Sequence, residues 1–433
     1  MKICIFSNHF FPENFRINDI AFELSKKYDI TVVTAVPDYP QGKFYDGYSL
    51  LKRRKEIVNG VFVYRLPRIP RGKGGILRLM LNYGSYFMAA LFFTIFSLHR
   101  EKYDAIFVHL TSPFFIGLPA VVLKRILNVP LVFWTLDLWP ESLSVVGGIR
   151  NKHILNSQLK LVQYIYNNCD KILIGSQGFK KSICEKGDYA AKLVYFPNWA
   201  EDVCLSKNIS TYRHLESLVR SDENDFIILF AGNIGEAQNL ECVLDAAFAL
   251  TSKGNKSIKF IFLGDGRRRE KLIKDMNNYG LSHTVFFLGC YPLDSMPIFM
   301  RQADVLLVSL KDELIFNVTI PAKLQFYMAQ SKPILAMING DGADLVANAK
   351  CGITVPANNT RALQAAIEQL YNMPKNELKL MGKNGKHHYD TYFSRLKRIE
   401  QLDMIFSSLK KKQKTCETVT GLSIHTVGHI VPK

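Results

Sequence analysis

Short apolar runs alternate with longer amphipathic runs along the 433 residues of the chain. In the first half, the runs that are typical of strands lie at 2–7, 30–34, 61–66, 105–109, 130–135, 171–175 and 192–196. Helical periodicity separates them near 15–27, 76–98, 115–127, 156–168 and 177–186. Some strands, such as Ala105-Ile106-Phe107-Val108, are apolar at every position, as expected when helices cover both faces of a parallel sheet.

A polar stretch at 205–225 interrupts the alternation, and we interpret it as a linker. The pattern then starts again, with strands predicted at 226–231, 258–263, 284–288, 304–308 and 333–337. Helices are predicted near 239–252, 267–279, 321–330, 341–349 and 360–371. The sequence therefore predicts an α/β fold of two facing Rossmann-like, doubly wound domains. Since such sheets bind ligands at the carboxyl ends of their strands, we expect the active site in the cleft between the domains.

The predicted domains span 1–200 and 201–390. Helical periodicity continues through 391–412, and we expect this segment to pack back on the first domain. Residues 413–433 are predicted to be a basic tail without a defined fold.

Positive charge is concentrated in two segments of the chain. The formal net charge is +17, from 55 Lys and Arg against 38 Asp and Glu. Segment 52–78 carries +8 and segment 408–433 carries +4, so the remainder is close to neutral. No helix-turn-helix, zinc-finger or RNP-like motif accompanies the basic segments, which makes nucleic acid the weakest of the partners that a basic protein can have. We therefore expect no nucleic-acid partner.

The segment 79–98 has no charged residue and the length of a membrane span. A span is disfavoured because the strands predicted at 61–66 and 105–109 belong to one sheet, and a span would separate them. Two interpretations remain: a buried core helix, or a helix that lies in the membrane interface beside the basic segment 52–78. We favour the second, with an anionic membrane surface as partner.

The eight cysteines form no C-x-x-C pair, which suits a reducing compartment and argues against a zinc site. The first apolar run, at 2–7, is too short for a signal peptide. We expect a cytoplasmic protein that is peripherally attached to the inner face of the cell membrane.

Two glycine turns in the second half follow predicted strands and precede helices. Glycine allows backbone N–H groups to approach a phosphate, and the helix N-terminus adds a favourable field. A third strand end could frame the edge of a base. The candidates are Gly232, Asn233 and Gly235 with Gln238 in the first turn, Gly264, Asp265 and Gly266 in the second, and Tyr291 after the third strand. An ordinary tight turn between a strand and a helix is the alternative for either glycine motif.

Pro321, Ala322 and Lys323 open a predicted helix. Proline suits the first turn, where N–H donors are free. A lysine there is electrostatically unfavourable unless an anion is also bound, so Lys323 is a candidate partner for a diphosphate. The alternative is a solvated surface lysine.

The chain resembles the retaining glycosyltransferases of family 4, which have the GT-B fold, over nearly its whole length. Motifs shared with the branch of bacterial N-acetyl-L-fucosamine transferases of O-antigen and capsule assembly are Phe11-Pro12-Glu13, Pro37-Asp38-Tyr39-Pro40-Gln41-Gly42, Asp137-Leu138-Trp139-Pro140-Glu141-Ser142, Asn233-Ile234-Gly235 and Pro321-Ala322-Lys323-Leu324-Gln325. The resemblance implies an acceptor-binding first domain and a nucleotide-sugar-binding second domain. It also implies a UDP-sugar donor and a lipid-diphosphate-linked saccharide acceptor.

The chain departs from the family at its usual donor-binding positions. Asn233 and Gln238 stand where the family commonly has Arg and Lys, and Val318 and Phe326 stand where it commonly has two glutamates. We therefore assign the phosphate to Lys323, and we name Gln325 as a partner for the ribose or sugar.

In the first half, Asp137 follows the strand at 130–135 and is the leading candidate for assisting the acceptor hydroxyl, with Glu141 beside it. A helix-capping role is the alternative for Asp137. His109 is a weaker choice. The chain has no D-x-D triplet, so we predict a metal-independent enzyme without a cofactor.

The resemblance thus implies a retaining glycosyltransferase that moves an N-acetylated hexose from a UDP-sugar to a lipid-linked saccharide. The alternatives are a nucleotide-sugar epimerase of the same fold, which would have no use for segment 76–98, and a non-catalytic membrane-associated assembly protein.

Overall fold

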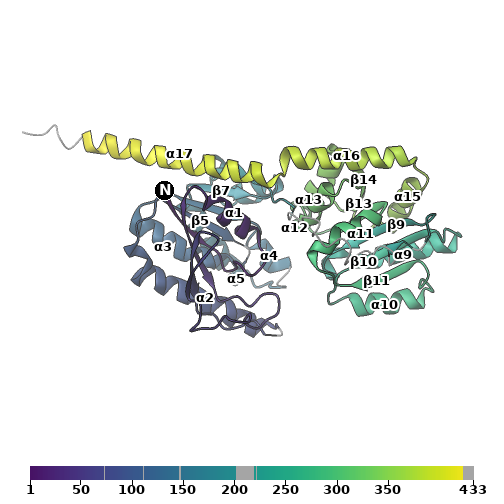
Figure 1. Ribbon diagram of the computed structural model, residues 1–433, viewed down its shortest axis with the longest axis horizontal. Coiled ribbons are helices and arrows are strands. Elements are labelled where there is room, and N and C mark those ends of the chain that lie inside the picture. Colours follow the sequence, from purple (N-terminus) through teal and green to yellow (C-terminus); the bar gives the residue numbers. More distant parts are fainter. Residues whose placement is uncertain (73, 111, 146–147, 201–218, 221, 423–433) are drawn as a thin grey trace, which may run out of the picture. The chain divides into compact units, whose positions relative to one another are not determined.

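Two parallel sheets organise the chain in a computed structural model (Figure 1). It describes residues 1–72, 74–110, 112–145, 148–200, 219–220 and 222–422, with side chains up to residue 410. Unit 1 comprises Met1–Ile174, Lys180–Phe196 and the segment that begins at Leu396. Unit 2 comprises Gly175–Phe179 and Pro197–Arg395. The predicted linker at 205–225 lies largely outside the described residues.

The sheet of unit 1 has eight strands in the order β3-β4-β2-β1-β5-β6-β7-β8. All neighbours are parallel except the edge strand β3, which pairs antiparallel with β4. The strands are β1 (Lys2–Phe6), β2 (Asp29–Ala35), β3 (Lys55–Val58), β4 (Val61–Leu66), β5 (Ala105–Leu110), β6 (Leu131–Thr135), β7 (Lys171–Ile174) and β8 (Leu193–Tyr195). The strand order reverses between β1 and β5, so the carboxyl ends of these two strands flank the switch point where such sheets bind ligands.

The helices of unit 1 cover its sheet. They are α1 (Arg16–Leu24), α2 (Ile76–Phe96), α3 (Leu118–Leu127), α4 (Glu141–Val145), α5 (Lys152–Asn168), α6 (Gly178–Cys184), whose first two residues belong to unit 2, and α17 (Arg395–Leu422), whose first residue does. Because both faces of the sheet are covered, β1, β5 and β6 are buried at almost every position.

The sheet of unit 2 is entirely parallel, in the order β11-β10-β9-β12-β13-β14. Its strands are β9 (Phe226–Ala231), β10 (Ile258–Leu263), β11 (Val285–Gly289), β12 (Val305–Ser309), β13 (Ile334–Met337) and β14 (Gly352–Val355). Its helices are α9 (Leu240–Ser252), α10 (Arg269–Asn278), α11 (Met296–Gln302), α12 (Leu314–Asn317), α13 (Ala322–Ala329), α14 (Asp341–Asn348), α15 (Thr360–Tyr371) and α16 (Lys375–Tyr392). Apolar clusters fill both sides of this sheet, and its switch point lies between β9 and β12.

The C-terminal helix α17 packs on unit 1. Phe406 contacts the ring of Phe107 on β5, with ring centroids 6.1 Å apart. Asp403 accepts from Lys27 at 2.8 Å, and Gln401 donates to the Tyr195 carbonyl at 2.9 Å. Helix α17 continues to Leu422, so the expectation that the fold ends at 412 is wrong for residues 413–422. The rest of the expected tail, 423–433, lies outside the described residues.

Candidate functional site

The glycine turns after β9 and β10 are joined to one another by backbone hydrogen bonds. Gly232 N donates to Leu263 O at 2.9 Å, and Ile234 N donates to Asp265 O at 2.8 Å. Gly264 has a φ of +128°, and a Cβ added there would lie 1.9 Å from Gly232 O. This approach requires glycine, so Gly264 and Gly266 build the site by holding two loops together.

The β11 end joins the same arrangement, since Gly264 N donates to Gly289 O at 2.8 Å. Tyr291, two residues further, is half-buried and packs on Phe299 with ring centroids 4.6 Å apart. The structure thus brings together the ends of β9, β10 and β11, which carry three of the predicted motifs.

Lys323 lies on the first turn of α13, two residues after the N-cap Pro321. Its Nζ lies 3.6 Å from the centroid of the Phe230 ring at the end of β9. A Cβ added at Gly232 would lie 3.2 Å from this nitrogen, which places the ammonium beside the first glycine turn.

The described residues supply no counter-ion to the Lys323 ammonium. Its Nζ is buried, with no hydrogen-bond partner among the residues that the structure describes, although the residue as a whole is partly exposed. Burial lowers the pKa of Lys323 to about 7, because the charged form loses its hydration. An anion bound at this point would supply the missing partner and favour the charged form.

Two other candidates from the second half stabilise the local backbone. Gln238 Oε1 accepts from Gly235 N at 3.1 Å, within its own turn. Gln325 is 1% exposed, and its amide nitrogen is placed to donate to the carbonyl oxygen of Pro321 at 3.0 Å. The assignment of Gln325 to a ribose or sugar is therefore wrong, because its side chain points into its own helix and not outward.

Asn233, Asp265 and Ala322 remain accessible at this edge of unit 2. The Asp265 carboxylate accepts from Gly266 N at 2.8 Å, which leaves its other oxygen for a ligand. The face available to a ligand therefore consists of Gly232, Asn233, Asp265 and the first turn of α13.

In unit 1, Asp137 and Glu141 are in different environments. Burial raises the pKa of Asp137 to about 6, and in the described part of the chain its carboxylate has no hydrogen-bond or ion-pair partner. Glu141 accepts from Lys186 at 2.6 Å and from Ser182 at 2.7 Å. Asp137 is thus placed to exchange a proton near neutral pH. One Glu141 oxygen is held by Lys186 and Ser182, while the other is buried without a hydrogen-bond partner among the described residues, so a catalytic role for Glu141 stays a prediction.

A buried charged network follows the strand ends of unit 1. Glu13 accepts from His9 at 2.6 Å and from the backbone N–H of Asp38 at 2.7 Å, and Asp38 pairs with Arg68. Burial tends to raise the pKa of Glu13, but the hydrogen bond from His9 and the charges of His9 and Arg68 hold it below its usual value. Burial also lowers the pKa of His9.

The sequence motifs included Glu13 and Asp38, but sequence reasoning missed that Arg68 joins them in one network. A signal was available, since Asp38 and Arg68 each follow the end of a strand, β2 or β4, within three residues. His109 at the end of β5 contacts Ser7 Oγ at 3.0 Å, and burial lowers its pKa to about 3. It is neutral at physiological pH and part of the buried structure.

Models of glycosyltransferases match both halves of the chain. The model described as glycosyl transferase 4-like domain matches residues 15–199, and the model of glycosyl transferases group 1 matches residues 217–388. Among curated relatives, the glycosyl transferase WcaI of Escherichia coli, named for colanic acid biosynthesis, is 25% identical over 346 residues, which is 76% of this chain and 81% of WcaI. The glycosyltransferase WbjE of Pseudomonas aeruginosa is 25% identical over 65% of this chain and 70% of its own length.

Solved structures share the fold at low identity. The Anabaena protein HepE, in complex with UDP and glucose, superposes with a TM-score of 0.67 at 16% identity, over 94% of this chain and all of its own. Sucrose-phosphate synthase from Thermosynechococcus elongatus gives a TM-score of 0.71 at 16% identity, over 94% of this chain and 98% of its own. The protein is therefore a group 1, family 4-like glycosyltransferase of the GT-B fold.

Proposed function

We propose that the protein transfers a sugar from a UDP-sugar to a lipid-linked saccharide in the assembly of a bacterial surface polysaccharide, an O-antigen or a capsule. The sugar that we expect is N-acetyl-L-fucosamine or a related N-acetylated hexose, transferred with retention of configuration. The single observation that carries the proposal is the buried Lys323 ammonium, which lies beside Gly232 and has no counter-ion in the described part of the chain. The name of WcaI supports the polysaccharide, and the UDP complex of HepE supports the donor.

The role that we propose for Lys323 is to stabilise the leaving diphosphate. Negative charge builds on this group as the bond to the sugar breaks, and fixed donors aimed at that charge lower the barrier. Lys323 would supply one positive charge, and the free N–H groups of the first turn of α13 would supply further donors. In unit 1, Asp137 is the group that we assign to the acceptor hydroxyl, as an orienting or proton-accepting carboxylate.

The substitution Lys323→Ala tests the donor site. A hydrogen bond to a charged group is worth about 1.5–3 kcal/mol, so UDP should bind about 10- to 100-fold more weakly, and turnover should fall with it. Calorimetry with UDP and a turnover assay with a lipid-diphosphate acceptor are the measurements. Lys271→Ala, an exposed lysine on α10, is the matched control. Unchanged UDP affinity and turnover in Lys323→Ala would show that this site is wrongly assigned.

Helix α2 supports attachment to a membrane, because it buries polar side chains and exposes apolar ones. Among the described helices, it is the one long and apolar enough to span a bilayer by length and composition. Its buried face includes the polar Asn82 and Thr94, and Asn82 donates to Asp38 at 2.9 Å. Its outward face is apolar, with exposed fractions of 40–80% at Ile76, Leu77, Met80, Leu81, Met88, Phe92, Ile95 and Phe96. A soluble helix normally has the opposite arrangement.

A basic segment lies next to this helix. Phe93 of α2 contacts the ring of Tyr64 on β4, and the Lys55 ammonium lies over the same ring at 5.5 Å from its centroid. Lys52, Arg53, Arg54 and Lys55 are all exposed, as are Leu51 and Ile57. We propose that α2 lies in the interface of the cytoplasmic leaflet while these cations contact anionic headgroups, each worth about 1 kcal/mol.

Vesicle flotation tests the membrane surface. The protein should float with vesicles of phosphatidylglycerol and phosphatidylethanolamine, and the double variant M88E/F92E should stay in the soluble fraction. Ile126→Glu, which changes an exposed apolar residue on α3 of the same unit, is the control and should float like the unmodified protein. Equal flotation of M88E/F92E and the unmodified protein would contradict the proposal.

A further inference from the structure

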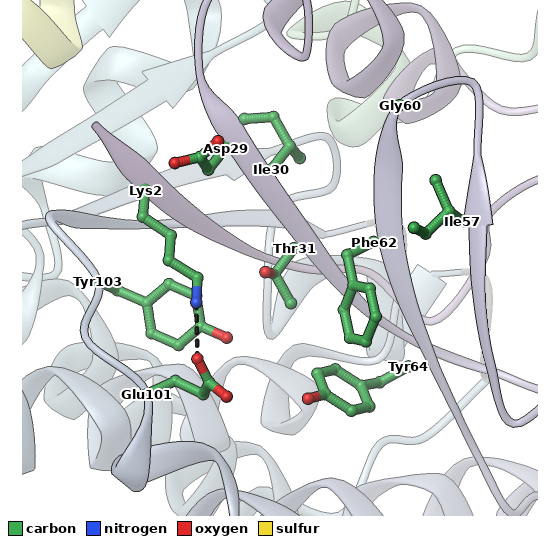
Figure 2. Close-up of a pocket in the computed structure, with 10 residues that line it drawn as sticks. All are labelled: Lys2, Asp29, Ile30, Thr31, Ile57, Gly60, Phe62, Tyr64, Glu101 and Tyr103. Carbon is green, nitrogen blue, oxygen red and sulfur yellow. Dashed lines mark hydrogen bonds and ion pairs between the residues drawn. The ribbon is translucent and has the colours of Figure 1, made fainter.

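A pocket of about 380 Å³ opens at the amino-terminal ends of the strands of unit 1. The candidate residues of unit 1, such as Asp137, follow the carboxyl ends of its strands, so this pocket is separate from them. It is large enough for a small ligand, since binding pockets commonly enclose about 300–1,000 Å³. Its walls come from β1, β2, the β3–β4 hairpin and the segment before β5, and they are lined by Lys2, Asp29, Ile30, Thr31, Ile57, Gly60, Phe62, Tyr64, Glu101 and Tyr103 (Figure 2).

Polar groups of both kinds point toward the middle of this pocket. Figure 2 shows the Lys2 ammonium, the Glu101 carboxylate and the hydroxyls of Tyr64 and Tyr103 directed toward one another, with Thr31 above them. Lys2 Nζ donates to Glu101 Oε2 at 2.6 Å. Several groups remain for a ligand, because a carboxylate accepts at two oxygens and an ammonium has three donors.

The hydroxyl of Tyr103 is the group that most clearly indicates a ligand. Tyr103 is 6% exposed, and within the described part of the chain its hydroxyl makes no well-formed hydrogen bond, although the Thr31 side chain lies close enough to interact with it. Burial raises the pKa of this phenol, so it keeps its proton and can donate. A buried hydroxyl without a well-formed hydrogen bond is costly, and its persistence beside a pocket fits a position that serves binding.

The remaining walls define the chemistry of the ligand. Phe62 and Tyr64 present aromatic rings, with centroids 4.9 Å apart, and Ile30 and Ile57 add apolar surface. Rings of this kind pack against the C–H faces of sugars. Glu101 neutralises Lys2 and Asp29 adds a negative charge, so the pocket has no spare positive charge for a phosphate.

We propose that this pocket binds a neutral saccharide, at a site additional to the donor and acceptor sites of the transferase reaction. The aromatic rings of Phe62 and Tyr64 would pack on the sugar, and Glu101 and Tyr103 would accept from and donate to its hydroxyls. The inference does not depend on which sugar the enzyme transfers.

Saturation-transfer NMR on protein saturated with UDP tests the pocket. The probes are N-acetyl-D-glucosamine, L-fucose and maltotriose at millimolar concentration. At least one should receive saturation from the unmodified protein, and Tyr103→Phe and Glu101→Gln should each reduce the signal at least fivefold. Tyr164→Phe on α5, a half-exposed tyrosine far along the chain from the pocket, is the control and should keep the full signal.

Thermal unfolding separates lost binding from a lost fold. Tyr103→Phe removes a hydroxyl that makes no well-formed hydrogen bond, so its Tm should stay within a few degrees of that of the unmodified protein. No saccharide signal in the unmodified protein would overturn the inference. Equal signals in the unmodified protein and in folded Tyr103→Phe would overturn it too, as would a titration in which inorganic phosphate displaces the saccharide.

Discussion

Lys323 combines two properties that rarely coincide in a folded protein. Its ammonium is buried, yet the structure offers it the face of Phe230 where a carboxylate would normally be found. The attraction between a cation and an aromatic ring offsets part of the hydration energy that the ammonium loses on burial, but a carboxylate would offset more of it. The residue is therefore a preorganised charge whose missing partner is an anion.

This environment makes donor binding depend on pH. Lys323 has a pKa of about 7, and a bound diphosphate would raise it because it stabilises the ammonium. Below pH 7 the lysine is already charged. Above pH 7 binding must take up a proton, so UDP affinity should fall as pH rises from 7 to 9, by up to about tenfold per pH unit.

Calorimetry at pH 8 in two buffers of different ionisation enthalpy measures this proton uptake. Lys323→Arg keeps the positive charge without a titration in this range and should bind UDP without the uptake. A UDP affinity that stays constant between pH 7 and 9 would contradict the assignment.

A second prediction at this scale concerns metals. Since Lys323 and the first turn of α13 would balance the charge of the leaving diphosphate, turnover should persist after treatment with EDTA. The measurement is turnover before and after chelation. A loss of tenfold or more that Mg²⁺ restores would show that a metal provides the charge instead.

Single residues were predictable where local rules apply and unpredictable where a distant partner decides. Lys323 could be predicted because a lysine at a helix N-terminus conflicts with the helix dipole. Gln325, two residues on, could not, because the sequence does not reveal that its amide turns back to Pro321. The pairing of Arg68 with Asp38 was missed because it joins residues thirty positions apart.

At the scale of elements, apolar content decided what the sequence could predict. Strands such as β1, β5 and β9 are buried along their length and were found from their apolar runs. Strand β3 was missed because it is a half-exposed edge strand with charged residues, and α16 was missed because its sequence is mostly polar. The contact between the β9 and β10 loops was also not predicted, because a glycine motif indicates a turn but not which other loop the turn contacts.

That loop contact can be tested with a pair of glycine substitutions. In Gly264→Ala the new methyl group would collide with Gly232 O, whereas Gly254→Ala, also at positive φ, has nothing within 4 Å. Both should lose about 1–2 kcal/mol to backbone strain. Gly264→Ala should lose about 1–3 kcal/mol more and bind UDP weakly, measured by urea unfolding and calorimetry. Equal losses in the two variants would show that the loops do not depend on this contact.

At the scale of the whole molecule, the units are not two consecutive pieces of chain. The sequence predicted one boundary near residue 200, but the chain passes between the units at 174/175, 179/180, 196/197 and 395/396. The short excursion 175–179 is bound in unit 2, where Gly178 N and Ser176 Oγ both donate to Asp341. A fragment that starts at 197 would therefore leave Asp341 without these partners. Apolar patterns cannot predict such crossings, because they show strands and helices but not which sheet a loop joins.

The reversed polarity of α2 also determines how the protein behaves when lipid is absent. Asn82 donates to Asp38 and to the Ile69 carbonyl, at 2.9 and 2.7 Å, and these bonds fix the rotation of the helix about its own axis. The helix cannot rotate to bury its exposed apolar face, which includes Met88 and Phe92, without breaking these hydrogen bonds. In aqueous buffer without lipid, we expect the apolar face of one copy to pack on that of another, so the purified enzyme should self-associate as its concentration rises. Mild detergent should cover this apolar face and dissociate the oligomers, so it should be present from cell lysis onward.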